Sequence, residues 1–432
     1  MTGKKASVKP NIPKSVTRGW ICFTGLICYM ISLYFIRIFN INNSLGAIVA
    51  GLAFVIPIIL LEYLVLKTYN KASTGLNFKV KNKLSVERVL IKLIGLYATL
   101  GLVVLLYWLF PEYHSGGYDN YFVLAKYLLL IIVFVSIPYF SILDMYLVEP
   151  KEEYWKVGMI VMGKWKEINF EGLKNFFLGW LVKAFFLPLM YNGLVGNIGF
   201  IKEHPFTTVY DFSSFYNYMV NYIYTIDLAV VTVGYLMTLR IFDSHIRTVE
   251  PSFLGWYVAL QCYQPFWGAL QGNYFNYQEM SWDIWIAPHQ ILYVVWGSLI
   301  LVLIAVYSWA SVYFGVRFSN LTNRGILTNG PYRFMRHPAY VSKNLSWWLV
   351  SVPFISIESP YAAIKHCLLL LLVNFIYFMR AKTEERHLSQ DPTYVQYATA
   401  MNERGIFKGL FKIFPFLKYD ASKYQKVIQD KT

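Results

Sequence analysis

Charged side chains are scarce in this sequence. Asp, Glu, Lys and Arg together make up 15% of the 432 residues, whereas soluble domains carry about 25%. Hydrophobic residues make up 56%, and the mean hydropathy is +0.42. This composition excludes an ordinary water-soluble globular protein and favours a chain that folds in a lipid bilayer.

Cysteine is also rare, with four residues in the whole chain. Cys22, Cys28 and Cys367 lie in apolar runs, and Cys262 lies in an aromatic run. None of the four has the spacing of a metal-ligand pair. We therefore expect packing residues rather than disulfides or zinc ligands, and we predict no metal site.

Long apolar runs are what the sequence has in abundance. A helix needs about 20 mostly apolar residues to cross the hydrocarbon core of a bilayer. The candidate runs are 19–39, 45–66, 90–110, 124–147, 176–199, 217–239, 253–271, 291–316, 340–357 and 361–379. The sequence therefore predicts an all-α polytopic membrane helical bundle of about ten transmembrane helices, with a cytoplasmic C-terminal helical segment.

The seventh run, 253–271, contains three Gln and Pro265. It either crosses the membrane or forms a broken, interfacial or re-entrant segment. Around it the chain divides into three parts. These are an N-terminal transmembrane bundle at 1–250, an aromatic segment at 251–287 and a C-terminal unit at 288–432.

The net charge of +15 comes from basic residues in the gaps between apolar runs, not from one continuous basic surface, so we expect no nucleic-acid partner. Lys and Arg crowd the second and fourth gaps and are absent from the third, PEYHSGGYDNY. Cytoplasmic loops carry such an excess. This predicts a multi-pass protein with cytoplasmic N- and C-termini. Arg336 lies on the cytoplasmic side only if the run 253–271 crosses the membrane.

One ionisable residue lies inside an apolar run. Asp227 is costly to bury in the run 217–239, and we expect it to mark a polar cavity. Lys183 in the fifth run is its candidate partner, and the alternative is that both side chains lie near water.

The most informative stretch begins near Asn320. Pro338 can begin a helix because its missing N–H is one that the first turn does not use. Arg333 and Arg336 lie just upstream, so the free amides of this helix start should attract an anionic part of a ligand. On the helix that follows, Tyr340 and Asn344 share one face with Trp347 and Ser351.

A second stretch follows the last apolar run, and both together resemble the isoprenylcysteine carboxyl methyltransferase family. The elements of this pattern are Gly330-Pro331-Tyr332-Arg333, then Arg336-His337-Pro338-Ala339-Tyr340, then Glu384-Glu385, then Tyr394 and Tyr397. The resemblance covers roughly the C-terminal quarter of the chain. Tyr394 and Tyr397 are equally typical of anchors at the membrane interface.

The resemblance implies S-adenosylmethionine as the cofactor, bound between the two stretches. The residues that we expect to bind it are Tyr332, His337, Pro338, Tyr340, Asn344, Glu384, Glu385 and Tyr397. The residues that we expect to take part in catalysis are Arg333, Arg336 and His337. Aromatic faces stabilise a cationic sulfonium, and aromatic residues are abundant here.

The implied reaction is methyl transfer to a lipophilic small molecule or lipidated substrate taken from the bilayer. A carboxylate acceptor, as in the family, needs no base, whereas an amine or hydroxyl acceptor would require proton removal by His337 or a glutamate. We expect the additional N-terminal helices to shape a lipid pocket or to support a homodimer.

Two other functions fit parts of the sequence. A sterol-reductase-like membrane oxidoreductase also has about ten spans and a similar arginine-histidine-proline segment, and Arg380, Lys382 and Arg386 are candidate ligands for the phosphate of NADPH. A transporter is a third interpretation, suggested by Asp227 and the broken seventh run.

Overall fold

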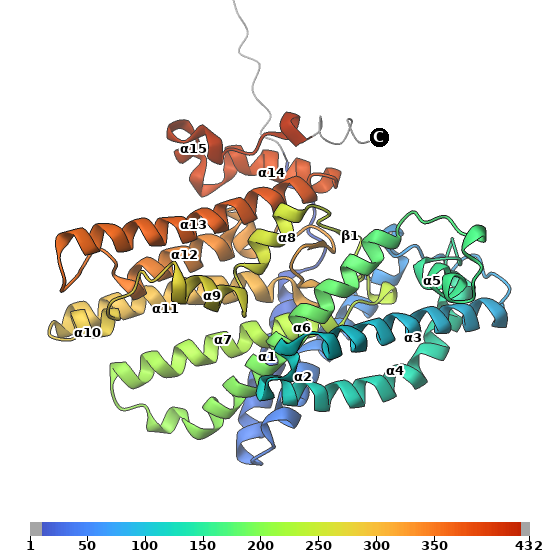
Figure 1. Cartoon of the computed structure of the whole chain (residues 1–432), viewed down its shortest axis with the longest axis horizontal. Helices are drawn as coiled ribbons and strands as arrows, with labels where there is room; N and C mark the ends of the chain where they lie inside the picture. Colours follow the sequence, from blue (N-terminus) through green and yellow to red (C-terminus); the bar gives the residue numbers. More distant parts are fainter. Residues whose placement is uncertain (1–10, 425–432) are drawn as a thin grey trace, which may run out of the picture.

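The computed structural model of the protein describes residues 11–424 as an all-helical bundle (Figure 1). Residues 1–10 and 425–432 contain the two chain ends and lie outside the described residues. The cytoplasmic placement of the termini therefore stays a prediction.

Within residues 11–424, eight helices are long and apolar enough to cross a membrane. They are α1 (Gly19–Ile38), α2 (Asn43–Leu64), α3 (Val86–Leu109), α4 (Asp119–Tyr146), α6 (Leu173–Glu203), α7 (Phe212–Leu236), α11 (Gln290–Val312) and α13 (Pro360–Leu388). Many of their large apolar side chains face outward: Trp108 is 70% exposed and Phe134 is 74% exposed. Such a surface is stable in lipid and not in water, which agrees with an integral membrane protein.

Polar caps and prolines set where several of these helices begin. Asn42 and Ser85 accept hydrogen bonds from the first turns of α2 and α3, and Asp211 forms a capping box with Ser214 at the start of α7. Ser359 caps α13, which has Pro360 at its first position.

The number of long spans is eight rather than the predicted ten. The run 253–271 is divided into α8 (Phe253–Leu260) and α9 (Phe266–Asn273), with Pro265 at the break. The run 340–357 forms only the 14-residue helix α12 (Pro338–Ser351), about 21 Å long at 1.5 Å per residue. It ends because Val352 precedes a proline, which disfavours helical backbone, and Val352 adopts a φ of 38°.

Both shorter segments still run from one end of the bundle to the other. The segment that contains α8 and α9 starts beside Glu250, which pairs with Arg386 near the end of α13. It reaches Glu279, which accepts hydrogen bonds from Ser356 and Ile357 in the loop between α12 and α13. The short helix α10 (Trp282–Ile286) then leads into α11. Within residues 11–424 the chain therefore passes along the bundle ten times, in the predicted order.

The predicted basic gaps meet at one end of the bundle. Leu76 and Leu147 form an isolated β-bridge between the second and fourth gaps, near α5 (Glu153–Val161). The two short strands β1 (Thr248–Val249) and β2 (Thr322–Asn323) pair antiparallel, with Thr248 opposite Asn323. Beyond α13, the helices α14 (Pro392–Arg404) and α15 (Leu410–Ile413) lie together at this end (Figure 1).

A buried ion pair joins the N-terminal bundle to the C-terminal unit. Arg317 donates to both carboxylate oxygens of Glu62, at 2.6 and 2.9 Å, and neither side chain is exposed. Glu62 also accepts a hydrogen bond from Thr17 at 2.6 Å. Such a bidentate contact satisfies both charges in a site without water.

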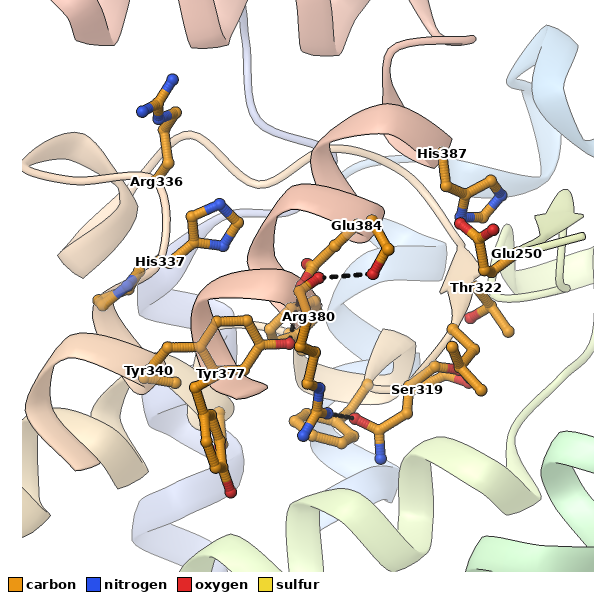
Figure 2. Close-up of a pocket in the computed structure, with 18 of the residues that line it drawn as sticks. Glu250, Ser319, Thr322, Arg336, His337, Tyr340, Tyr377, Arg380, Glu384 and His387 are labelled. Carbon is orange, nitrogen blue, oxygen red and sulfur yellow. Dashed lines mark hydrogen bonds between the residues drawn. The ribbon is translucent and has the colours of Figure 1, made fainter. Parts of the chain in front are cut away.

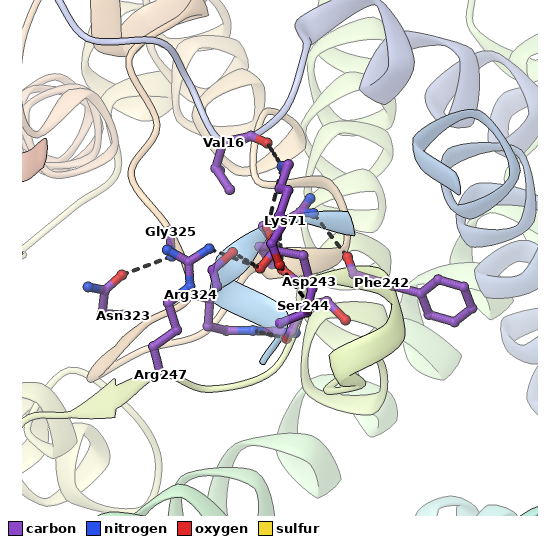
Figure 3. Close-up of polar contacts among 12 residues, drawn as sticks. Val16, Lys71, Phe242, Asp243, Ser244, Arg247, Asn323, Arg324 and Gly325 are labelled. Atoms are coloured by element: carbon purple, nitrogen blue, oxygen red, sulfur yellow. Dashed lines mark hydrogen bonds and ion pairs between the residues drawn. The ribbon is translucent and has the colours of Figure 1, made fainter. Parts of the chain in front are cut away.

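Asp243 and Arg324 extend this connection (Figure 3). Asp243 contacts Lys71 at 3.3 Å and Arg247 at 3.0 Å. Burial alone would raise the pKa of Asp243, but Arg317 and the other neighbouring cations hold it below its usual value. Arg324 donates to five backbone carbonyls, which belong to Gly234, Met237, Ser244, Val316 and Phe318.

The predicted partnership of Asp227 with Lys183 is wrong. Asp227 accepts a hydrogen bond from Tyr307 at 2.8 Å. Lys183 contacts Thr238 at 3.5 Å, and its ammonium group lies 3.4 Å from the centre of the Trp180 ring. Asp227 therefore faces α11 rather than the lysine of α6.

We expect Glu62→Gln and Arg317→Met each to lower the free energy of unfolding by about 3–5 kcal/mol, because either change leaves one buried charge without a partner. Thermal unfolding of the purified protein in detergent measures this. Glu167→Gln, at an exposed position, is the matched control and should change stability by less than about 0.5 kcal/mol. A loss below about 1 kcal/mol in both test variants would contradict the role of the pair.

Candidate functional site

A cavity lies where the two predicted stretches meet. Its walls come from the end of α11, the loop that leads into α12, the first turns of α12, the second half of α13 and the region of β1 and α8. It contains about 940 Å³ of space between protein atoms, part of which is open to solvent.

The turn before α12 forms one side of the cavity. Pro338 is the first residue of α12, as predicted, and His337 precedes it with a φ of −127°. Figure 2 shows Arg336 and His337 on one side of the cavity, His387 and Glu250 on the other, and Glu384 between them.

The two adjacent glutamates at the end of α13 point in different directions. Glu384 lines the cavity and accepts a hydrogen bond from Tyr340 at 2.7 Å. The side chain of Glu385 is only 2% exposed and does not line the cavity. Successive helical residues are turned by about 100°, so one member of the pair can face a ligand while the other is buried.

Glu385 connects α13 to the turn before α12. Its carboxylate lies 3.3 Å from Nε of Arg336, 3.2 Å from Nε2 of His337 and 3.0 Å from Nζ of Lys382. Arg336 also donates to the carbonyl of Leu417 at 2.6 Å. The position of the arginine-histidine pair therefore depends on Glu385.

Arg380 occupies the centre of the cavity wall. It donates to Asn320 at 2.7 Å, and its guanidinium lies 5.0 Å from the ring centre of Tyr340. The rings of Tyr263 and Tyr377 lie 5.4 and 5.9 Å away. Cation–π contacts of this kind stabilise a buried guanidinium.

Glu250 and Thr322 form the opposite wall near β1 and β2. Oε1 of Glu250 accepts from Arg386 at 2.9 Å, whereas its Oε2 is buried without a hydrogen-bond partner among the described residues. Oγ1 of Thr322 is likewise unpaired there, and His387 contacts Thr248 at 2.9 Å. Two unpaired polar atoms in one cavity wall leave hydrogen bonds for a ligand to complete.

The structure brings together some of the predicted site residues but not all of them. Those that line the cavity are Tyr332, Arg336, His337, Pro338, Tyr340 and Glu384. Those that do not are Arg333, Asn344, Glu385 and Tyr397. Of the second group, Arg333 is exposed, and Asn344, Glu385 and Tyr397 make other contacts that explain their positions.

Arg333 is the last residue of the short 3-10 helix Gly330–Arg333, and it is exposed. Asn344 donates to the carbonyl of Tyr340 at 2.7 Å and accepts from Asn374 at 2.6 Å. It therefore joins α12 to α13 instead of facing the cavity.

Tyr397 of α14 contacts the turn before α12 on the side away from the cavity. Its hydroxyl donates to the backbone carbonyls of Tyr332 at 2.6 Å and Met335 at 3.2 Å. Burial raises the pKa of Tyr397, so the phenol keeps the proton that it donates. Tyr397 thus positions the cavity-lining residues without contacting the cavity.

Several cavity residues carry no motif in the sequence. Glu250, Tyr263 and Tyr307 come from three separate segments and meet only in the folded chain. The sequence drew attention to Arg380 as a candidate phosphate ligand, and no local pattern singled out Lys343, which also lines the cavity.

Residues 291–390 match the isoprenylcysteine carboxyl methyltransferase (ICMT) family model. The resemblance inferred from the motifs is thereby confirmed for this part of the chain. The matched segment runs from the first turn of α11 to just beyond α13 and contains the arginine-histidine turn and both glutamates. No curated protein and no solved structure matches the chain.

The different surroundings of the two glutamates lead to a prediction about stability. Glu385→Gln should lower the free energy of unfolding by about 3–5 kcal/mol, because it leaves the Arg336 guanidinium without its buried counter-ion. Glu384→Gln is the matched control and should cost less than about 1 kcal/mol, since an amide oxygen can still accept from Tyr340. Thermal unfolding in detergent compares the two. Equal losses would contradict the separate roles.

Proposed function

We propose that the protein is a membrane-embedded methyltransferase that uses S-adenosylmethionine and acts on a lipidic or membrane-associated acceptor. One observation carries the proposal. The arginine-histidine turn and the acidic end of α13 both belong to the segment that matches the ICMT family, and although more than forty residues separate them, they line one cavity. Direct contacts between His337 and Glu385 and between Tyr340 and Glu384 hold them together.

The side chains of the cavity suit the parts of this methyl donor. The unpaired Oε2 of Glu250 and the carboxylate of Glu384 can accept hydrogen bonds from ribose hydroxyls or an ammonium group. The rings of Phe314 and Phe318 provide apolar surface for a base. When bound, S-adenosylmethionine supplies a methyl group on a cationic sulfonium, which Tyr faces can stabilise.

The chain's own contribution to such a reaction is positioning. Tyr340 is oriented by its hydrogen bond to Glu384, and His337 by its contact with Glu385. Rigid placement of two reactants with water excluded lowers the barrier to direct methyl transfer. The family name points to a carboxylate acceptor on a prenylated cysteine, and a carboxylate needs no base.

The contacts of the basic residues make NADPH a poorer fit. Arg380 is bound to Asn320, Lys382 to Glu385 and Arg386 to Glu250. A dinucleotide phosphate needs cations that are available to it, whereas Lys382 and Arg386 are each paired with a carboxylate of the chain. S-adenosylmethionine carries no phosphate and makes no such demand.

Equilibrium binding of labelled S-adenosylmethionine to the purified protein tests the proposal. The wild-type protein should bind S-adenosylmethionine. At the concentration that saturates the protein with S-adenosylmethionine, NADPH should not saturate it. Glu384→Gln and His337→Ala should each weaken binding by roughly tenfold or more, because each removes a charged or hydrogen-bonding group from the cavity.

The exposed Glu403 offers a matched control. Glu403→Gln should leave the affinity for S-adenosylmethionine within about twofold of wild type, since single substitutions away from such contacts rarely matter. Tight binding of NADPH with no binding of S-adenosylmethionine would reverse the assignment in favour of a reductase.

A further inference from the structure

Lys343 is a charged side chain in the cavity wall with no part in the contacts that hold the turn before α12 against α13. It lies in the second turn of α12 and lines the cavity. Its ammonium group lies 5.4 Å from the ring centres of Tyr307 and Trp347 and 5.8 Å from that of Tyr377. Among the described residues it has no hydrogen-bond acceptor and no ion-pair partner.

The hydrogen-bond donors of this ammonium group are not satisfied by the described residues. It has three N–H donors, and the three rings stabilise its charge but accept none of these hydrogens in ordinary hydrogen bonds. Charged groups within a membrane protein are costly and usually mark a ligand site or an ion path. The other cation in this wall, Arg380, differs because it is hydrogen-bonded to Asn320.

Asp227 and Tyr307 complete the surroundings of Lys343. Tyr307 presents its ring to the ammonium group and donates its hydroxyl hydrogen to Oδ2 of Asp227 at 2.8 Å. Oδ1 of Asp227 is buried without a partner among the described residues. Asp227 belongs to α7, outside the segment 291–390 that matches the family model, so the N-terminal bundle supports a residue that lines this part of the cavity.

The charges here favour an anionic ligand group. Lys343 and Arg380 bring two positive charges to the cavity wall. The two nearby carboxylates already accept hydrogen bonds from tyrosines, Glu384 from Tyr340 and Asp227, behind the wall, from Tyr307. A carboxylate placed against Lys343 would receive charge-assisted hydrogen bonds, which are stronger than neutral ones.

We propose that Lys343 binds the carboxylate of a ligand in the cavity, and that Tyr307 and Asp227 position its ammonium group. The inference rests on the proposed function for the identity of the ligands. Two ligands carry this chemistry: the amino-acid end of S-adenosylmethionine and a carboxylate acceptor. Lys343 would in either case select for negative charge, a property that can be measured apart from catalysis.

Paired probes that differ only in the carboxylate test this on the full-length protein in detergent. The donor pair is S-adenosylmethionine and its decarboxylated form. The acceptor pair is N-acetyl-S-farnesylcysteine and its carboxamide. Binding of all four is measured for wild type, for Lys343→Met and for Lys365→Met, the last being a matched change of an exposed lysine in α13.

If Lys343 binds the donor, Lys343→Met weakens the binding of S-adenosylmethionine by roughly tenfold or more. The affinity for the decarboxylated form then stays within about twofold of wild type. If it binds the acceptor, the same selective loss occurs for farnesylcysteine and not for its carboxamide. Lys365→Met should resemble wild type in both pairs. Asp227→Asn and Tyr307→Phe should produce a smaller loss with the same selectivity, which a merely structural defect would not do.

Three results would overturn the inference: Lys343→Met binds all four probes as wild type does, it weakens the charged and neutral members of a pair equally, or the wild type binds none of them. Failure of the proposed function looks different. In that case the wild type prefers the charged acceptor probe and depends on Lys343 to do so, yet it neither binds S-adenosylmethionine nor transfers its methyl group.

Discussion

The contact of Glu385 with Arg336, His337 and Lys382 is the interaction on which the site depends. It fixes the end of α13 against the turn that starts α12, so two stretches far apart in sequence become opposite sides of one cavity. Because Glu385 is buried, this contact is rigid and poorly screened by salt. Glu384 and Tyr340, which do face the cavity, are then placed by their neighbours rather than by any ligand.

The N-terminal bundle is connected to this site through buried charges and is not a separate module. Arg317 reaches Glu62 on α2, and Arg324 is bound by carbonyl groups on both sides of the junction. The β1–β2 pairing places Glu250 in the cavity wall, and Asp227 supports Tyr307 from α7. The helices outside the family segment therefore shape the cavity as well as occupying the membrane.

Apolar run length predicted the helices well, and the proline at the start of α12 predicted where that helix begins. Run length could not show that α12 is short, because the apolar sequence continues past Val352 whereas the helical backbone conformation ends there. The joint motif located the cavity, but it could not separate Glu384 from Glu385, since which face of a helix is buried depends on its partner. Glu250, Tyr263 and Tyr307 could not be predicted as neighbours, because only tertiary contacts bring their segments together.

The shortness of α12 has a consequence for the surrounding lipid. A helix of about 21 Å is roughly 9 Å shorter than the hydrocarbon thickness of a typical bilayer. Beyond it, the chain continues as the turn that contains Ser356 and Ile357, whose polar groups are bound by Glu279. The apolar surface that lipid tails contact along α12 is therefore shorter than the apolar surface along α4 or α6. The bilayer should be locally thinner there, and thin membranes would accommodate the protein with the least deformation.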